Sequence, residues 1–252
     1  MVDLDNKWKD TCAILLGAEI GDLQDYENYL RRFVPLLSLK QSKISNKDVF
    51  TLGKYPTGTK FISADEHDLY QSTLSTEKLD INQIKDLDSL VGAILERVCC
   101  AGNIHIGNTF DVTHSDHIFD SSSVYHSSDI LWCKNISHSA ILKYSENIFG
   151  SHFATKVQFA IHSFALYESS RIFEAVRIYF SSDCYYSSNL EGCQNCMFSF
   201  NLRNKHNCIG NLELSQDKYA SLKSKILEEI RETLKSKKSV LSVIDLIGGS
   251  HE

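Results

Sequence analysis

The chain has 252 residues, a formal net charge of −6 and an apolar fraction of 42%. A chain of this length can bury a substantial core, as one large domain or two modest ones. The acidic balance and the lack of a lysine or arginine stripe argue against a protein that binds nucleic-acid phosphates. A carboxylate stripe, which a nucleic-acid mimic would need, is also missing from the sequence.

The start of the chain and its cysteines bear on where the protein works. Met1 to Asp10 is polar and charged, and no long apolar segment follows it, so neither a signal peptide nor a membrane span is predicted. Eight cysteines in a chain without an export signal are expected to be reduced thiols. We therefore expect a cytoplasmic protein without a membrane partner.

Residues 1–100 are predicted to form an α+β region that caps one end of a repeat. A helix is predicted from Asp22 to Pro35, with an apolar face of Leu23, Tyr26, Leu30, Phe33 and Val34. Residues 48–62 predict a hairpin turned at residues 55–58, where Pro56 suits a type I turn. A second helix is predicted over residues 80–98, with inward-facing Ile81, Ile84, Leu87, Val91, Ile94 and Val98.

A six-residue repeat dominates the middle of the chain, where every sixth residue from Ile106 to Cys208 is apolar. A small residue, chiefly serine, follows three places later in most units, and Asn or Asp often precedes the apolar residue. A period of six does not fit an α-helix, but it fits short extended segments joined at bends. Residues 101–214 are therefore predicted to form a single-stranded β-helix in a mainly β chain.

The size of one coil is inferred from the side chain two places after the apolar residue. Taken every eighteen residues, this position gives an aromatic ladder of His126, Tyr144, His162, Phe180 and Phe198. Taken every twelve residues, it mixes unlike groups, namely Trp132, Tyr144, Lys156, Glu168, Phe180 and Gly192. This comparison predicts three hexads per coil and a triangular cross-section, and it leaves the handedness open.

Residues 215–252 are predicted to form a C-terminal capping helix and a tail. Ser215 can N-cap a helix over residues 216–238, whose apolar stripe is Tyr219, Leu222, Ile226, Ile230 and Leu234. The apolar tail over residues 240–247 either packs as a final strand or binds a partner. Helical caps at both ends would cover the exposed strand edges of the β-helix.

Four residues near the end of the repeat, Cys193, Cys196, His206 and Cys208, are of the types that bind zinc. Cys196 and Cys208 also lie on the inward apolar lattice, and Cys193 takes the small position, so buried thiols explain them without a metal. We predict no cofactor, with this zinc site as the alternative. The histidines are paired by no motif with a nucleophile, so no catalytic residue is assigned.

Aromatic residues are unusually frequent at outward positions of the repeat. Such residues are either covered by the flanking segments or form a surface for a partner, because large apolar patches are rare on monomers. The partner face predicted from the sequence consists of Tyr125, His126, Tyr144, His162, Tyr179, Phe180 and Phe198.

Two classes of function follow from this pattern. The first is a non-catalytic interaction or assembly scaffold that binds a protein partner, with self-association and glycan binding as further forms of recognition. The alternative is a β-helix enzyme, either an acyltransferase or a carbohydrate-active enzyme. An enzyme would need a groove lined by a histidine or by convergent carboxylates such as Asp116, Asp120, Glu168 and Glu174.

The closing part of the repeat resembles a known group of sequences. Residues 201–209, which read Asn-Leu-Arg-Asn-Lys-His-Asn-Cys-Ile, followed by Ser215 and Tyr219, are similar to the end of an uncharacterised family of cysteine-rich hexad-repeat proteins from uncultured bacteria. The resemblance covers about residues 184–222 and implies a β-solenoid that ends in a helix. Members of that family carry more cysteines and an upstream zinc ribbon, which this sequence lacks. The resemblance implies no activity.

Overall fold

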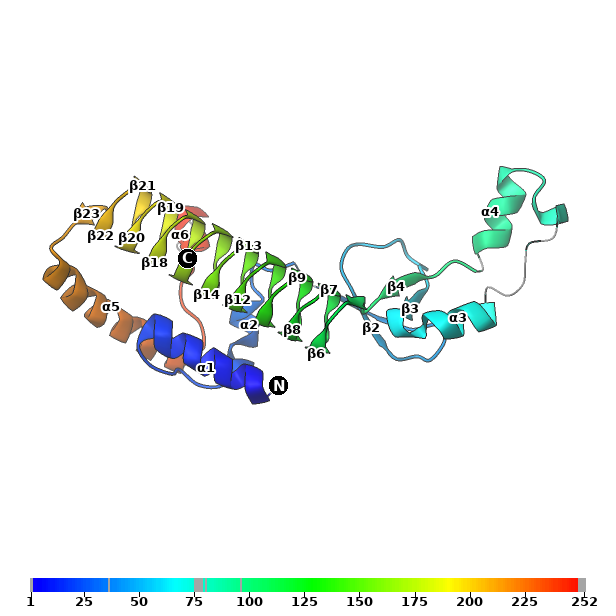
Figure 1. Ribbon diagram of the computed structural model, residues 1–252, viewed down its shortest axis with the longest axis horizontal. Coiled ribbons are helices and arrows are strands. Elements are labelled where there is room, and N and C mark those ends of the chain that lie inside the picture. The colour runs from blue at the N-terminus through cyan, green and yellow to red at the C-terminus, as the bar shows by residue number, and fades with distance from the viewer. Residues whose placement is uncertain (1, 36, 75–78, 80, 96, 249–252) are drawn as a thin grey trace.

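A β-solenoid forms the body of the molecule, and helices lie at the N- and C-terminal ends of the chain (Figure 1). The computed structural model describes residues 2–35, 37–74, 79, 81–95 and 97–248. The prediction of a mainly β chain, with a β-helix and helices at both ends, is confirmed.

Two sheets build the solenoid, and successive strands alternate between them. The even sheet has ten strands, namely β6 (Phe110–Thr113), β8 (Ser122–Tyr125), β10 (Lys134–Ser137), β12 (Glu146–Phe149), β14 (Gln158–Ile161), β16 (Ser170–Phe173), β18 (Ser182–Tyr185), β20 (Gln194–Met197), β22 (His206–Ile209) and β23 (Leu212–Glu213). The odd sheet has nine strands, namely β5 (His105–Ile106), β7 (Asp116–Phe119), β9 (Ser128–Leu131), β11 (Ala140–Lys143), β13 (His152–Thr155), β15 (Phe164–Tyr167), β17 (Val176–Tyr179), β19 (Ser188–Glu191) and β21 (Phe200–Arg203). Neighbouring strands are parallel, except that β23 closes the even sheet antiparallel to β22.

Each coil contains two hexads, so the prediction of three hexads per coil is wrong. Ile136 pairs with Ile148, and Leu142 pairs with Ala154, so that each residue lies beside the residue twelve places later. The coil is therefore a flattened, two-sided one instead of a triangle.

The error came from looking for identical neighbours, whereas neighbours twelve residues apart are complementary. Lys156 Nζ lies 2.7 Å from Glu168 Oε1, although this pair had counted against a twelve-residue coil. The rings of Trp132 and Tyr144 stack with their centroids 4.9 Å apart. Opposite charges and stacked rings on adjacent strands stabilise a sheet as well as like residues do.

The apolar lattice faces the axis, as predicted. Ile130, Ile148 and Leu166 are buried, and every lattice residue from Ile118 to Cys196 is buried in the internal core. Only lattice residues near the two ends depart from this rule, because Ile106 is exposed, and Val112 and Leu202 are half-buried. The interior thus consists of stacked aliphatic, alanine and cysteine side chains.

Left-handed backbone conformations recur at every third residue of the solenoid. The predicted Asn and Asp positions adopt them, for example Asp129 at φ 53° and Asn147 at φ 59°. They lie in the middle of the four-residue strands, and a second set occupies the corners between strands, as at His126 and Phe180. The positive φ of each such residue changes the direction of the backbone, so that the side chain of the next residue points inward.

A pair of alanine substitutions tests the cost of this backbone. Ala165 has φ 55°, so Ala165→Gly should raise the free energy of unfolding by roughly 1 kcal/mol, because glycine has no Cβ to clash in the left-handed region. Ala160, which is buried with an ordinary φ, is the matched control, and Ala160→Gly should lower stability by a similar amount. Urea unfolding measures both, and destabilisation of equal size at the two sites would contradict the prediction.

Serine ladders run along both inner corners of the solenoid. Ser139 Oγ donates a hydrogen bond to the Ser137 carbonyl at 2.8 Å and accepts one from the Ser151 N–H at 3.1 Å. The same pattern repeats in most coils, and Cys133 replaces serine in the other ladder, where its Sγ accepts the Ser145 N–H at 3.4 Å. The small position must therefore be short and must also donate and accept, which explains the preference for serine.

Removing one step of this ladder should be costly. Ser139→Ala leaves the buried Ser151 N–H without its acceptor, so we expect a loss of roughly 1–3 kcal/mol of stability. Ser128 Oγ is also buried but has no hydrogen-bond partner among the described residues, so Ser128→Ala should be close to neutral. Equal losses in the two variants, measured by chemical denaturation, would rule out this role for the ladder.

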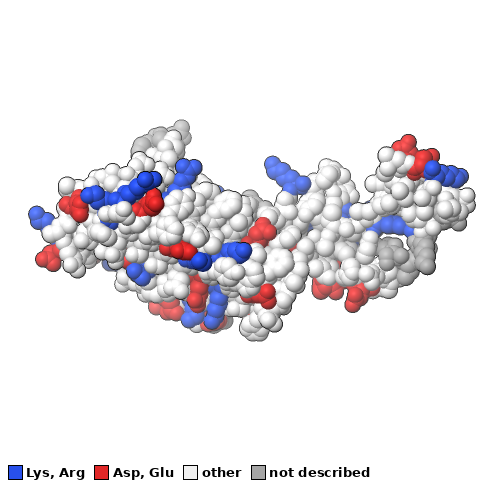
Figure 2. Space-filling view, turned by 45° about the horizontal axis from the view of Figure 1, so that its top comes forward, with Lys and Arg blue, Asp and Glu red and all other residues white. Residues whose placement is uncertain are grey.

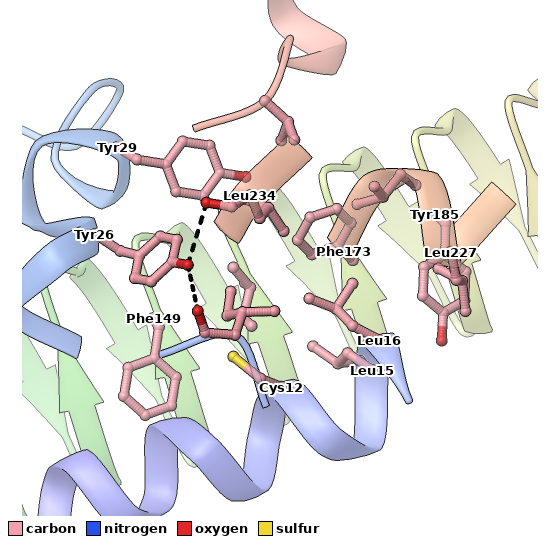
Figure 3. Packing of buried hydrophobic residues seen from close by; sticks show 14 of the residues in the cluster. Cys12, Leu15, Leu16, Tyr26, Tyr29, Phe149, Phe173, Tyr185, Leu227 and Leu234 are labelled. Carbon is pink, nitrogen blue, oxygen red and sulfur yellow. Dashed lines mark hydrogen bonds between the residues drawn. The ribbon is translucent and has the colours of Figure 1, made fainter. Parts of the chain in front are cut away.

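The even sheet is covered by helices that pack on an outward apolar column of Phe149, Ile161, Phe173, Tyr185 and Met197. The helix α1 (Val2–Leu16), which the sequence analysis did not predict, lies along the side of the solenoid with α5 (Gln216–Lys237) (Figure 1). Figure 3 shows Leu15 and Leu16 of α1 and Leu227 and Leu234 of α5 meeting in this second core. The molecule thus has one core inside the coils and another between the even sheet and its own helices.

The remaining N-terminal elements differ from the predicted ones. The expected helix over residues 22–35 is only η1 (Leu23–Tyr26) followed by α2 (Glu27–Leu30). The expected hairpin over residues 48–62 is wrong, because β2 (Asp48–Thr51) pairs antiparallel with β1 (Ser38–Gln41) and β3 (Phe61–Ser63) pairs in parallel with β4 (Cys100–Gly102). A turn is present one residue later than predicted, over residues 56–59, because the Thr59 N–H donates a hydrogen bond to the Pro56 carbonyl. Pro56 is thus the first residue of the turn and not the second.

The helix predicted over residues 80–98 is shorter and does not face a core. It consists of η3 (Ile81–Gln83) and α4 (Leu87–Leu95), and it lies beyond η2 (Ala64–Glu66) and α3 (His67–Leu74) at the far end of the molecule (Figure 1). Ile81 is 77% exposed and Leu87 is 74% exposed. The inward orientation of this stripe is therefore wrong, because the apolar spacing specifies a face but not a neighbour for it.

The C-terminal helix is confirmed as α5, which begins after Ser215. Tyr219, Ile230 and Leu234 of its predicted stripe are buried, whereas Leu222 is exposed. The tail packs against the body as a short helix, α6 (Val243–Gly248), and not as a strand. Within the described part of the chain, no helix is long and apolar enough to cross a membrane.

Candidate functional site

The seven residues of the predicted partner face lie on two different sides of the solenoid. With twelve residues per coil, His126, His162 and Phe198 share one corner with Glu174, and Tyr125 is beside them on the even sheet. Tyr144 and Phe180 occupy the opposite corner, next to Tyr179 on the odd sheet. The aromatic ladder that grouped them at eighteen-residue intervals is therefore not a surface of the molecule.

The corner that carries His162 is closed by segments from both ends of the chain. Glu174, which is fully buried, accepts hydrogen bonds from the Tyr29 hydroxyl and, at 2.8 Å, from Ser242 Oγ. His162 Nδ1 lies 2.6 Å from the same carboxylate, and its ring stacks on Tyr29 at 4.3 Å. No substrate could reach this cluster, so its arrangement serves to fasten α2 and the α6 segment to the coils.

Gly150 makes room for this closure on the same corner. A Cβ at this position would lie 2.8 Å from Leu30 Cδ2, and the residue has φ 65°. Glycine is the residue that tolerates both the left-handed conformation and the close approach of another chain segment. The histidine column is therefore interrupted where α2 lies against the coil.

A hollow of about 460 Å³ lies beside this corner, bounded by α1, η1, Glu27, Tyr125 and His138. His138 is almost fully buried, and its Nε2 lies 3.6 Å from Glu27 Oε1, too far for a good hydrogen bond. Burial and, less strongly, the neighbouring His126 lower the pKa of His138 to about 4, although Glu27 opposes both effects. His138 is thus neutral near pH 7.

This lowered pKa predicts acid sensitivity. The folded chain holds His138 neutral, whereas the unfolded chain protonates it near its ordinary pKa, so the stability it contributes is complete above about pH 6.5 and is lost as the pH falls toward 4. We expect a loss of roughly 3 kcal/mol over this window, and His138→Gln should remove it. The pH profile of urea unfolding measures this loss, with His206→Gln, at an exposed site, as the matched control. An identical profile for wild type and His138→Gln would refute the assignment.

The opposite corner and the adjoining strands expose large side chains, which we call the aromatic edge: Trp132, Tyr144, Tyr167, Tyr179 and Phe180. Trp132 is 45% exposed and Phe180 is 56% exposed. Lys143 Nζ lies over the stacked rings of Trp132 and Tyr144, 5.4 Å and 5.6 Å from their centroids. Neighbouring rings support one another, which fixes their orientation before any partner binds.

A groove of about 350 Å³ interrupts the aromatic edge, lined by Tyr144, Lys156, Gln158, Glu168, Ser169 and Ser170. The ion pair of Lys156 and Glu168 crosses it, and the hydrogen bond between them holds the pKa of Glu168 below its usual value. Tyr167 and Phe180 make an edge-to-face contact at 5.3 Å on its far side. The edge therefore offers flat apolar rings on both sides of a polar centre.

A strip of apolar residues on the odd sheet was missed by the sequence analysis. Ile141 and Phe153 are exposed, and Phe164 and Val176 are half-buried beside them. The first two precede the inward lattice residue, a position that the repeat often gives to Asn or Asp. Apolar residues at this outward position, namely Ile141 and Phe153, were the signal in the sequence from which the strip could have been predicted. On the face drawn in Figure 2, charged side chains are scattered among broad uncharged areas.

The residues of the alternative zinc site do not surround one point. Cys196 and Cys208 are adjacent in the internal core, and Cys193 is buried in the serine ladder of the other corner, whereas His206 is exposed. Within the described residues, no group of three or more His, Cys, Asp or Glu side chains is arranged to hold a metal ion. Burial raises the pKa of the Cys196 thiol to about 12, which keeps it protonated.

The carboxylates considered for an enzyme have separate structural roles. Asp116 accepts the N–H groups of Ile104 and Leu52, and Asp120 accepts that of Asn108, so both cap the open first coils. Glu168 pairs with Lys156, and Glu174 is buried at the other corner. These carboxylates do not converge on a shared groove.

Comparisons of the chain with protein-family models, with curated proteins and with solved structures find no match. The candidate site is therefore defined by geometry alone. It consists of the exposed aromatic edge and the apolar strip on the odd sheet, whereas the even sheet is covered by the chain's own helices.

Proposed function

We propose that this protein is a non-catalytic β-solenoid scaffold that binds a protein partner through the aromatic edge and the odd sheet. The observation that supports the proposal is the asymmetry of the two sheets. The apolar column of the even sheet is buried under α1 and α5, whereas the apolar side chains of the odd sheet, such as Phe153 and Tyr179, face solvent.

The rings of the aromatic edge suit protein recognition. Aromatic side chains are enriched in protein interfaces, and rings already stacked on one another lose little conformational entropy on binding. The backbone behind them is held by parallel pairing in every coil, so the surface is rigid. Burial of all eight cysteines in whole or in part as free thiols is consistent with the reducing cytoplasm that we propose as its location.

Affinity capture with a triple variant tests this function. The substitutions Tyr144→Ser, Tyr179→Ser and Phe180→Ser remove three exposed rings without entering a core, so we expect recovery of bound proteins from the native host to fall at least roughly tenfold, as measured by quantitative mass spectrometry. Leu222→Ser removes an exposed apolar group from α5 on the other side and should change nothing. The same proteins recovered in the same amounts by all three forms would refute the proposal.

A further inference from the structure

One column of the odd sheet carries opposite charges at the two ends of an apolar segment. It runs, one residue per strand from β9 to β17, through Asp129, Ile141, Phe153, Ala165 and Arg177. Ile141 is 38% exposed and Phe153 is 47% exposed. Asp129 and Arg177 lie at equal distances along the column, two coils on either side of Phe153.

These two charges form no ion pair within the described part of the chain, whereas charges in two neighbouring columns do. Along neighbouring columns, Arg171 Nη2 lies 2.7 Å from Asp183 Oδ2, and Lys156 pairs with Glu168 at the same twelve-residue spacing. For Asp129 and Arg177, in contrast, no ion pair within 4.0 Å is formed with any described residue. The column is thus apolar in its middle and has one unpaired charge of each sign at its ends.

We propose that a second copy of this chain binds here, with the two odd sheets face to face and the two solenoids antiparallel. This inference rests on the proposed function of the odd sheet and names its partner. A two-fold axis parallel to the strands and passing beside Phe153 places Asp129 of each copy opposite Arg177 of the other. It also brings the two Phe153 rings together and sets Ile141 against Ala165.

The neighbouring column fits the same axis. It runs through Leu131, Lys143, Thr155, Tyr167 and Tyr179. The axis places Leu131 opposite Tyr179 of the second copy, which gives one apolar contact on each side. It also places Lys143, whose Nζ lies over the Trp132 and Tyr144 rings of its own copy, opposite the Tyr167 ring of the other. The axis would also place Lys156 opposite Lys156 of the second copy. Lys156 lies at the corner outside the flat sheet, however, and its charge is already paired with Glu168.

Such an interface is isologous, which means that both copies use the same surface. Each contact away from the axis therefore occurs twice, and the assembly closes as a dimer. Stacked sheets pack about 10 Å apart, a distance that side chains such as Phe153 and Ile141 can fill. Residue Phe33 and the α6 segment lie beside His152 and Phe164 at the far margin of the sheet, so the contact is confined to the two exposed columns and the aromatic edge.

A charge exchange tests the dimer. In sedimentation experiments over a concentration series, wild type should self-associate, and Asp129→Arg or Arg177→Asp alone should weaken association at least roughly tenfold, because each places like charges opposite each other twice. The double variant should restore association. The same thermal midpoint in all four proteins would exclude misfolding as the cause of the losses.

Symmetric cross-linking gives a second readout. Phe153→Cys lies on the axis, so a bismaleimide reagent that spans about 10 Å should join two copies there. Asn189→Cys, in the same column three strands away, should not be joined. A wild-type protein that stays monomeric at its highest soluble concentration, or cross-linking of equal yield at both sites, would overturn the dimer. If the wild type is monomeric but captures a different protein, and the aromatic-edge variant loses that protein, the proposed function stands and only the second copy is rejected as the partner.

Discussion

The hydrogen bonds of the inner serine ladders set the geometry on which the rest of this structure depends. Each Oγ satisfies a carbonyl of its own coil and an N–H of the next, so polar corners can be buried inside the solenoid. The corners must turn sharply within three residues, which requires left-handed conformations at side chains as large as Phe180. The strain of these residues is tolerated because parallel pairing on both sides holds each strand in place.

The two sheets of the solenoid differ in how far other segments of the chain cover them. One is completed by α1 and α5, which bury a second core of phenylalanine, tyrosine and leucine against it. Tyr29, His162, Glu174 and Ser242 then bind both terminal segments to one corner. The helices therefore stabilise the solenoid from one side and leave apolar side chains of the other side exposed, which is the surface that we propose for partner recognition and self-association.

The open edges of the repeat are closed by polar side chains and short strands instead of large helical caps. Asp116 supplies the acceptors that a preceding coil would have provided, and Asn211 hydrogen-bonds both the N–H and the carbonyl of Phe200 at the other end. The strand β23 folds back on β22 and completes the closure. These groups occupy part of each open edge, which disfavours edge pairing with another chain.

The six-residue repeat by itself determined the solenoid, its inward apolar residues and the small corner positions, because each depends only on neighbours along the chain. It also predicted α5 from a cap and a regular stripe. The number of hexads per coil was decided by contacts between strands, such as Lys156 with Glu168, which a search for identical residues overlooks. The covering of Phe149 and Phe173, the exposure of Tyr144 and Phe180, and the solvent-facing stripe of α4 were decided by where distant segments pack. Periodicity specifies which face of an element is apolar, but only tertiary structure decides what covers it.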